Sequence, residues 1–132
     1  MNTPGYNIWH GLTFEIVCIN HIKQMKNTLG ISGIETSEYS WRSCGSSPGT
    51  QIDLIIDRSD DVIDICEMKY SSDEFEIDPS YEKNLINKIN TFREETDTKK
   101  AIHLVLITTV GLKKNVHSDI IQNVITGEDL YS

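Results

Sequence analysis

Three acidic residues and one lysine lie in segments that are otherwise strongly apolar. Asp53 and, after a short polar break, Glu67 and Lys69 interrupt stretches rich in β-branched residues, and Glu15 lies among regularly spaced apolar residues near the N-terminus. Carboxylates gathered in an apolar setting repel one another, which is costly unless they are solvated or hold a cation. Together they can bind a hard divalent ion with water and a substrate phosphate, and a nearby lysine can stabilise developing negative charge. This combination suits the hydrolysis of a phosphodiester bond.

The segments around Asp53 and Glu67 predict the two strands of a β-hairpin, because both are rich in β-branched residues and a polar stretch separates them. Side chains alternate between faces along a strand, so Glu67 and Lys69 point the same way. If residues 59–61 form a three-residue loop, Asp53 lies opposite Glu67. A two-residue loop would pair Asp53 with Cys66 and put the two carboxylates on opposite faces. The stretch lacks an Asn-Gly pair, which favours the longer loop. The other interpretation places these charges on a solvated face, with Lys69 paired to one acid.

Glu15 is expected on a helix. Residues 8–29 carry apolar side chains at three- and four-residue steps, which predicts one helix. Glu15 falls within this apolar stripe, which should pack on the sheet, and a carboxylate there is costly unless it points at a metal-bound water. The spacing is equally compatible with Glu15 at the helix edge, reaching solvent. The stripe consists of Leu12, Ile16, Ile19, Ile22, Met25 and Leu29.

The remaining segments complete a single α/β domain over residues 1–132, with a central mixed sheet. Asp78 is expected to cap a second helix that has Pro79 in its first position and ends near Thr98. The order is therefore helix, three strands, helix and one or two strands. The other expected elements are strands at 33–42, 51–57, 62–70 and 101–108, the last buried on both faces, a loop at 43–50, a further strand at 116–125 and a helical turn from Thr126.

The bulk composition excludes several classes of protein. With 132 residues, of which 38% are hydrophobic and 24% charged, the chain suits one globular domain. No apolar run approaches the roughly 20 residues of a membrane span, and the N-terminus lacks a signal-peptide pattern. The three scattered cysteines form no CxxC pair, which predicts a cytoplasmic protein. The net charge of −8 counts against tight non-specific binding of nucleic acid, although another domain or a homodimer could hold DNA.

The constellation of Glu15, Gln51-Ile52-Asp53 and Glu67-Met68-Lys69, in the order helix, strand, strand, resembles the PD-(D/E)xK nuclease superfamily. The core of that superfamily runs α-β-β-β-α-β, and the proline of its name, replaced here by isoleucine, is not a ligand. More narrowly, residues 49–78 and 81–115 look like the nuclease-like C-terminal domain of certain bacterial and archaeal AAA-type ATPases. The chain has no GxxxxGK[ST] phosphate loop, so an ATPase domain would belong to another part of the protein or to another chain.

This resemblance implies a restriction-endonuclease-like sandwich and an endonuclease that hydrolyses DNA with Mg²⁺ or Mn²⁺ as cofactor. Asp53, Glu67 and the backbone carbonyl of Met68 would bind the metal, and Glu15 would hold a metal-bound water or a second ion. Lys69 would position the attacking water and offset charge in the transition state. Two other functions stay open: a non-catalytic interaction or regulatory domain of an AAA-type ATPase, and a small binding domain without metal. The residues implied for contact with substrate are Gln51, Tyr81 and Lys88.

Overall fold

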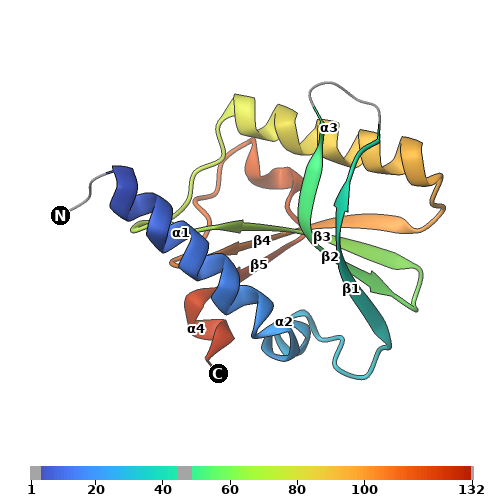
Figure 1. Ribbon diagram of the computed structural model, residues 1–132, viewed down its shortest axis with the longest axis horizontal. Helices are drawn as coiled ribbons and strands as arrows, with labels where there is room; N and C mark the ends of the chain where they lie inside the picture. The colour runs from blue at the N-terminus through green and yellow to red at the C-terminus, as the bar shows by residue number, and fades with distance from the viewer. Residues whose placement is uncertain (1–3, 45–48, 132) are drawn as a thin grey trace.

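The computed structural model of the protein describes residues 4–44 and 49–131. It is an α/β fold with one five-stranded sheet in the order β1-β2-β3-β4-β5 (Figure 1). The first three strands pair antiparallel, and β4 and β5 continue the sheet in parallel with β3. The predicted α/β class with a mixed sheet is therefore confirmed. The elements are α1 (Pro4–Ile19), α2 (Ile22–Leu29), β1 (Thr36–Arg42), β2 (Gln51–Arg58), β3 (Val62–Lys69), α3 (Pro79–Thr96), β4 (Ala101–Thr108), the 3-10 helix η1 (Ser118–Ile120), β5 (Asn123–Thr126) and α4 (Gly127–Leu130).

The sheet separates two hydrophobic cores, with α1 and α3 on opposite sides of it (Figure 1). On the α1 side, Phe14 and Cys18 pack with residues of α2, α4 and the strands. On the α3 side, Leu85 and Phe92 pack on isoleucines of β2 and β3. The alternation of side chains along β3 sends Cys66 to the first core and Ile65 to the second. Both faces of the sheet are thus covered, as a parallel crossover requires.

The hairpin has the three-residue loop that the sequence predicted. Leu54 pairs with Cys66 and Asp57 with Ile63, so counting inward leaves residues 59–61 as the loop. Asp61 adopts a left-handed conformation at φ 67°, a position that Asp tolerates better than most residues. The ladder between β2 and β3 thus has the register that puts Asp53 one step beyond the Leu54–Cys66 pair, on the side of Glu67.

A β-bulge lies in β2 next to Asp53. Tyr39 of β1 pairs with Ile55, but Trp41 pairs with Ile52, so β2 has one residue more than β1 in this stretch. Consequently Ile52 and Ile55, three positions apart, both lie in the core under α3. Asp53 lies between them in the bulged stretch of β2, and a bulge changes the direction of a side chain.

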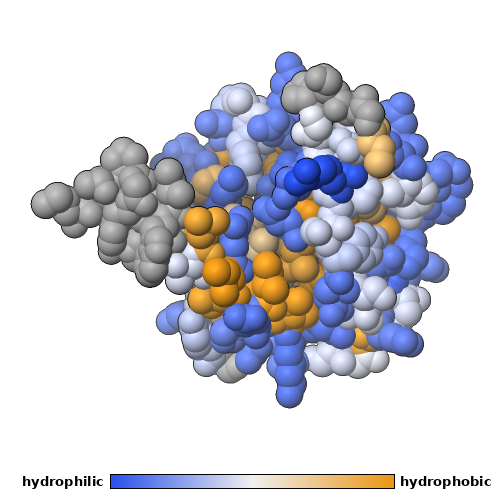
Figure 2. Space-filling view, in the orientation of Figure 1, coloured by the Kyte–Doolittle hydropathy of each residue, from blue (hydrophilic) through white to orange (hydrophobic). Residues whose placement is uncertain are grey.

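The prediction for the N-terminal helix was wrong in two respects. The helix is divided into α1 and α2 around Asn20 and His21. The predicted core residues Leu12, Ile16 and Ile19 are 56%, 60% and 48% exposed, whereas Phe14 and Cys18 are buried. Both sets have helical spacing, and the packed set is the one that carries the aromatic ring. Figure 2 shows apolar side chains gathered on the surface over this part of the molecule.

Helix α3, which was predicted from Asp78 and Pro79, begins as expected. The side chain of Asp78 accepts a hydrogen bond from the backbone N–H of Tyr81 at 2.7 Å, and Pro79 occupies the first turn. The helix ends at Thr96, two residues before the expected end, and Asp97 follows in a left-handed conformation. Strand β4 is buried from Leu104 to Thr108, as predicted, whereas its first three residues are exposed or half-buried.

The C-terminal part differs from the prediction. Residues 116–125 form η1 and the short β5 rather than one strand. The helical turn after Thr126 is present, with Asp129 accepting hydrogen bonds from the backbone and hydroxyl of Thr126. In the predicted loop, residues 45–48 lie outside the described part of the chain. None of the helices within residues 4–44 and 49–131 has the length and apolar character that crossing a bilayer requires.

Candidate functional site

Three of the four predicted catalytic residues meet at one end of the β2–β3 hairpin. The carboxyl group of Glu15, from α1, lies close enough to the side chain of Asp53, from β2, for the two to interact electrostatically. Burial raises the pKa of Glu15, the neighbouring carboxylate of Asp53 raises it further, and attraction by Lys69 of β3 lowers it. One helix and two strands thus contribute a close pair of carboxylates with an ammonium group within electrostatic range.

Asp53 is held by a chain of side-chain hydrogen bonds. Gln51 donates through Nε2 to Asp53 Oδ1 at 2.9 Å, and its Oε1 accepts from Arg42 Nη2 at 3.1 Å. Gln51 therefore lies beside the site, although its contact is with Asp53. Arg42 was not predicted, because its position depends on the register of β1 against β2, and residues 43–50 between these strands give no sign of that register.

Glu67 faces α3. It is only 7% exposed, and its Oε1 accepts hydrogen bonds from the Tyr81 hydroxyl at 3.0 Å and from Lys88 Nζ at 3.3 Å. Its Oε2 accepts from the same Lys88 nitrogen at 3.1 Å. Burial, and then the charge of Glu67, raise the pKa of Tyr81 well above its ordinary value, so the phenol remains a donor. The contacts of Glu67 thus go to α3, and the β2–β3 ladder ends one residue short of an Asp53–Glu67 pair.

Tyr81 interacts with both Glu67 and Lys69. Lys69 Nζ lies 5.1 Å from the centre of the Tyr81 ring, within the range of a cation–π interaction. The ring also contacts Phe75 edge to face, with centroids 5.5 Å apart. Tyr81 and Lys88 are two turns apart on α3, a spacing that puts them on one side of the helix. That spacing was the available signal that both could reach the same acid. The side chain of Met68 lies in the α1-side core, so its backbone carbonyl is the only group it could offer to the site.

The residues present fit a hard divalent cation in kind, because carboxylate oxygens are the ligands that Mg²⁺ prefers. Glu15 and Asp53 form the pair in which repulsion raises a carboxyl pKa, and a cation would relieve that repulsion. Glu67 is turned toward Tyr81 and Lys88. Accordingly, within the described residues no three acid, His or Cys side chains are grouped closely enough to hold a metal as they stand.

The other buried acid of the hairpin has a counter-ion built into the fold. Asp64, three residues before Glu67, is fully buried, and Arg58 donates to its Oδ2 at 3.2 Å. Asp60 binds the same guanidinium group at 2.6 Å. Burial raises the pKa of Asp64, whereas Arg58 lowers it. The fold thus supplies an arginine to the buried carboxylate of Asp64. Glu15, by contrast, has another carboxylate, that of Asp53, as its neighbour.

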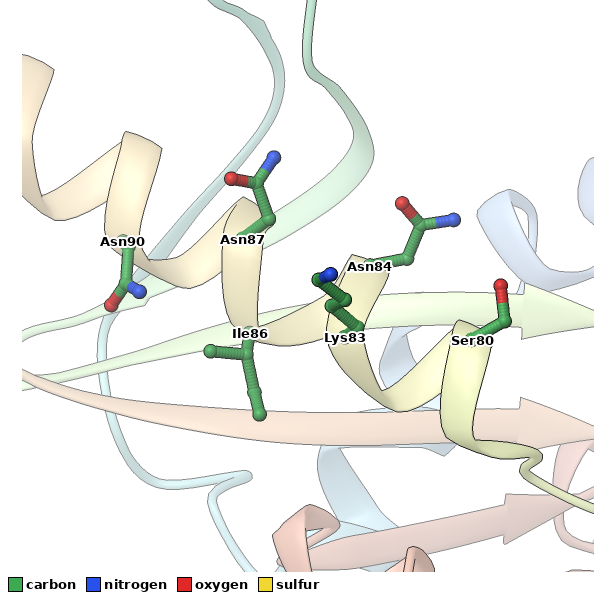
Figure 3. Close-up of a pocket in the computed structure, with 6 residues that line it drawn as sticks. All are labelled: Ser80, Lys83, Asn84, Ile86, Asn87 and Asn90. Atoms are coloured by element: carbon green, nitrogen blue, oxygen red, sulfur yellow. The ribbon is translucent and has the colours of Figure 1, made fainter.

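A shallow hollow lies on the outer side of α3 (Figure 3). Its lining contains three asparagines and one lysine but no acid, in a chain with 20 acidic residues. Asparagine offers both donors and acceptors, so this surface can form hydrogen bonds with a negatively charged polymer without repelling it. The lining residues are Ser80, Lys83, Asn84, Ile86, Asn87 and Asn90.

Replacing Glu15 by Gln should stabilise the metal-free protein at neutral pH by less than about 1 kcal/mol. Since the folded-state pKa of Glu15 is raised above 4.5, its ionised form costs stability at neutral pH. That cost fades as the pH falls through the raised pKa, so the two proteins should converge at about pH 4. Urea unfolding in metal-free buffer at both pH values measures this. Glu94→Gln, on the exposed side of α3, is the control and should show no gain at neutral pH. A Glu15→Gln protein that is less stable than the parent at neutral pH would contradict the prediction.

Comparisons with known proteins give information on the fold of this chain but none on its function. No protein-family model matches the sequence, and no curated protein matches it. Among solved structures, the chain is similar to the crystal structure of AF1548, a protein of unknown function, with a TM-score of 0.53 and 10% sequence identity. The likeness covers 83% of this chain and 56% of that one, so the chain spans little more than half the length of AF1548. At this identity the similarity shows a shared fold alone.

Proposed function

We propose that the protein is a metal-dependent nuclease domain that hydrolyses DNA phosphodiester bonds, with the restriction-endonuclease-like arrangement of the PD-(D/E)xK superfamily. The observation that carries the proposal is the meeting of Glu15, Asp53 and Lys69, which come from three separate elements. The carboxylates of Glu15 and Asp53 repel each other, and a bound cation would relieve that repulsion. The neighbouring acid Glu67 and the order of the elements support the same assignment.

Each residue has a role that follows from its contacts. Asp53, oriented by Gln51, and Glu15 provide the oxygens that would bind Mg²⁺ or Mn²⁺, together with Glu67 and the Met68 carbonyl. When bound, the metal supplies positive charge to the phosphate and promotes ionisation of water. Lys69, held beside the Tyr81 ring and attracted by Glu15, would orient the attacking water and offset charge that develops on the phosphate.

The proposed substrate is DNA, in spite of the net charge of −8. The hollow on α3 is free of acids among its lining residues, and its amides and Lys83 suit a strand that passes Tyr81 and Lys88 on the way to the acids. The proposal also includes an AAA-type ATPase domain, in the same or another chain, or a homodimer, that helps to hold the DNA. The free thiols of Cys18, Cys44 and Cys66 suit a site of action in the reducing cytoplasm.

A nicking assay on plasmid, branched and single-stranded DNA tests the proposal. We expect Mn²⁺ or Mg²⁺ to support cleavage of at least one of these substrates and EDTA to abolish it. Folded protein that cleaves none of the three at saturating metal would overturn the nuclease assignment.

The second candidate is a non-catalytic nuclease-fold domain that docks on or regulates an AAA-type ATPase. It is favoured because both carboxylate oxygens of Glu67 already accept hydrogen bonds from side chains of α3. This function requires no metal, so Lys69→Ala would leave ATPase binding unchanged. Absence of cleavage together with retained binding of such an ATPase would decide for it.

A further inference from the structure

Both oxygens of Glu67 are occupied by neighbouring side chains. Lys88 Nζ lies 3.1 Å from Oε2 and 3.3 Å from Oε1, so one ammonium group bridges the carboxylate. The Tyr81 hydroxyl takes a further position on Oε1. With a side-chain exposure of 7% for Glu67 and 27% for Lys88, this ion pair is largely shielded from water. A metal ion that approached Glu67 would therefore meet a cation already in place.

Helix α3 holds the backbone of Lys88 in place, and the Lys88 side chain is partly exposed to solvent. Leu85 and Phe92, on the same helix, are buried in the core under α3 and anchor the helix on the sheet. Asn84 and Asn87, beside Lys88 in the helix, are exposed. Lysine carries its charge at the end of a flexible four-carbon stem, so the ammonium group can leave Glu67 for solvent without any movement of α3.

Tyr81 differs from Lys88 in how it would respond to a cation. Its hydroxyl is neutral, and burial together with Glu67 keeps it protonated. A neutral donor on Oε1 does not repel a cation, and Oε2 is bonded only by Lys88 among the described residues. Departure of Lys88 alone would thus free one oxygen of Glu67 while Tyr81 still orients the carboxylate.

We propose that Lys88 is a built-in counter-cation of Glu67, which a divalent metal ion must displace before Glu67 can join Asp53 in binding it. This inference rests on the proposed function, since it concerns the metal of the proposed nuclease. Lys88 is a positioning residue in the metal-free state, and its displacement sets the apparent metal affinity. The freed ammonium group then reaches solvent, where a phosphate of the substrate strand can pair with it.

Titration of the metal-free protein with Mn²⁺, followed by calorimetry, tests the proposal without measuring activity. If Lys88 occupies Glu67 in most molecules, the apparent Kd is weakened by the fraction of molecules in the open state. We expect Lys88→Met to bind Mn²⁺ about tenfold more tightly than the parent, which corresponds to about 90% occupancy of Glu67 by Lys88. Lys88→Arg keeps the charge and should bind as weakly as the parent.

Lys114→Met is the matched control. Lys114 is exposed and lies outside the proposed site, and its replacement removes the same unit of charge from an acidic chain. It should bind Mn²⁺ like the parent, so a tighter Kd in both Met variants would show a general charge effect and overturn the inference. If Lys88→Met fails to fold, Lys88→Gln, which retains a donor for Glu67 without the charge, takes its place.

Thermal unfolding gives a second readout. Without metal, Lys88→Met should melt below the parent, because Glu67 keeps a buried charge with no counter-ion. Saturating Mn²⁺ should raise its Tm by more than it raises the Tm of the parent. Equal Mn²⁺ affinities in the parent and Lys88→Met would overturn the counter-cation role and leave the nuclease proposal intact. No saturable Mn²⁺ binding by any folded variant would overturn both.

Discussion

Replacing Asp53 by Asn should reduce metal-dependent cleavage of DNA by about a hundredfold to a thousandfold. The change preserves the size of the side chain and removes the negative charge that Asp53 places beside Glu15. Loss of that charge weakens the hold on the metal and on the phosphate. It also relieves repulsion, so the variant should unfold at the same temperature as the parent or higher in metal-free buffer. Single-turnover nicking rates at saturating Mn²⁺, measured beside thermal unfolding, give both quantities.

Two further variants make this experiment selective. Lys69→Ala should cause a similar loss of rate, because it removes the cation that would orient the water. Asp119→Asn removes the same charge as Asp53→Asn from an exposed position in η1 and should cleave like the parent. Cleavage by Asp53→Asn at the parental rate would mean that the acids at the hairpin end do not carry the reaction.

Replacing Phe92 by Ala should lower the free energy of unfolding by about 3–5 kcal/mol. Phe92 is 1% exposed, and its ring contacts Trp41 edge to face with centroids 5.1 Å apart. Truncation leaves a cavity between α3 and the sheet. Because α3 also carries Tyr81 and Lys88, a loosened helix should hold Glu67 less well. Urea denaturation, monitored by the fluorescence of the tryptophans, measures the change.

The control for this prediction lies on the same helix. Ile86 is 42% exposed on the outer side of α3, and Ile86→Ala should change the free energy of unfolding by no more than about 0.5 kcal/mol. A loss below about 1 kcal/mol in Phe92→Ala, relative to this control, would show that α3 is not held to the sheet by that side chain.

The parts of the fold that local chemistry determines were predictable from sequence. Asp78 and Pro79 define the start of α3 whatever surrounds them, because the cap and the proline act within one turn. The loop at residues 59–61 follows from the absence of a two-residue turn motif, and with it the register of β2 against β3. Strand β4 is recognisable because most of its residues are apolar.

The parts that depend on distant partners were not predictable. The first helix has two apolar stripes, and only packing on the sheet selects Phe14 and Cys18 over Leu12 and Ile16. Glu15 was expected in the wrong stripe, yet it meets Asp53, because it adjoins Phe14 on the side that packs. The choice of Tyr81 and Lys88 as partners of Glu67 depends on where α3 crosses the sheet, which no local pattern fixes.

The two outer strands of the sheet protect it against self-association. Strand β1 is largely exposed along its length and carries Glu38 and Arg42, and the bulge opposite it interrupts a flat pairing surface. At the other edge, β5 is four residues long and runs directly into α4. Short, charged or bent edges discourage strand-to-strand addition between molecules. The apolar interior strands β2, β3 and β4 are therefore kept away from the intermolecular pairing that leads to fibrous aggregates.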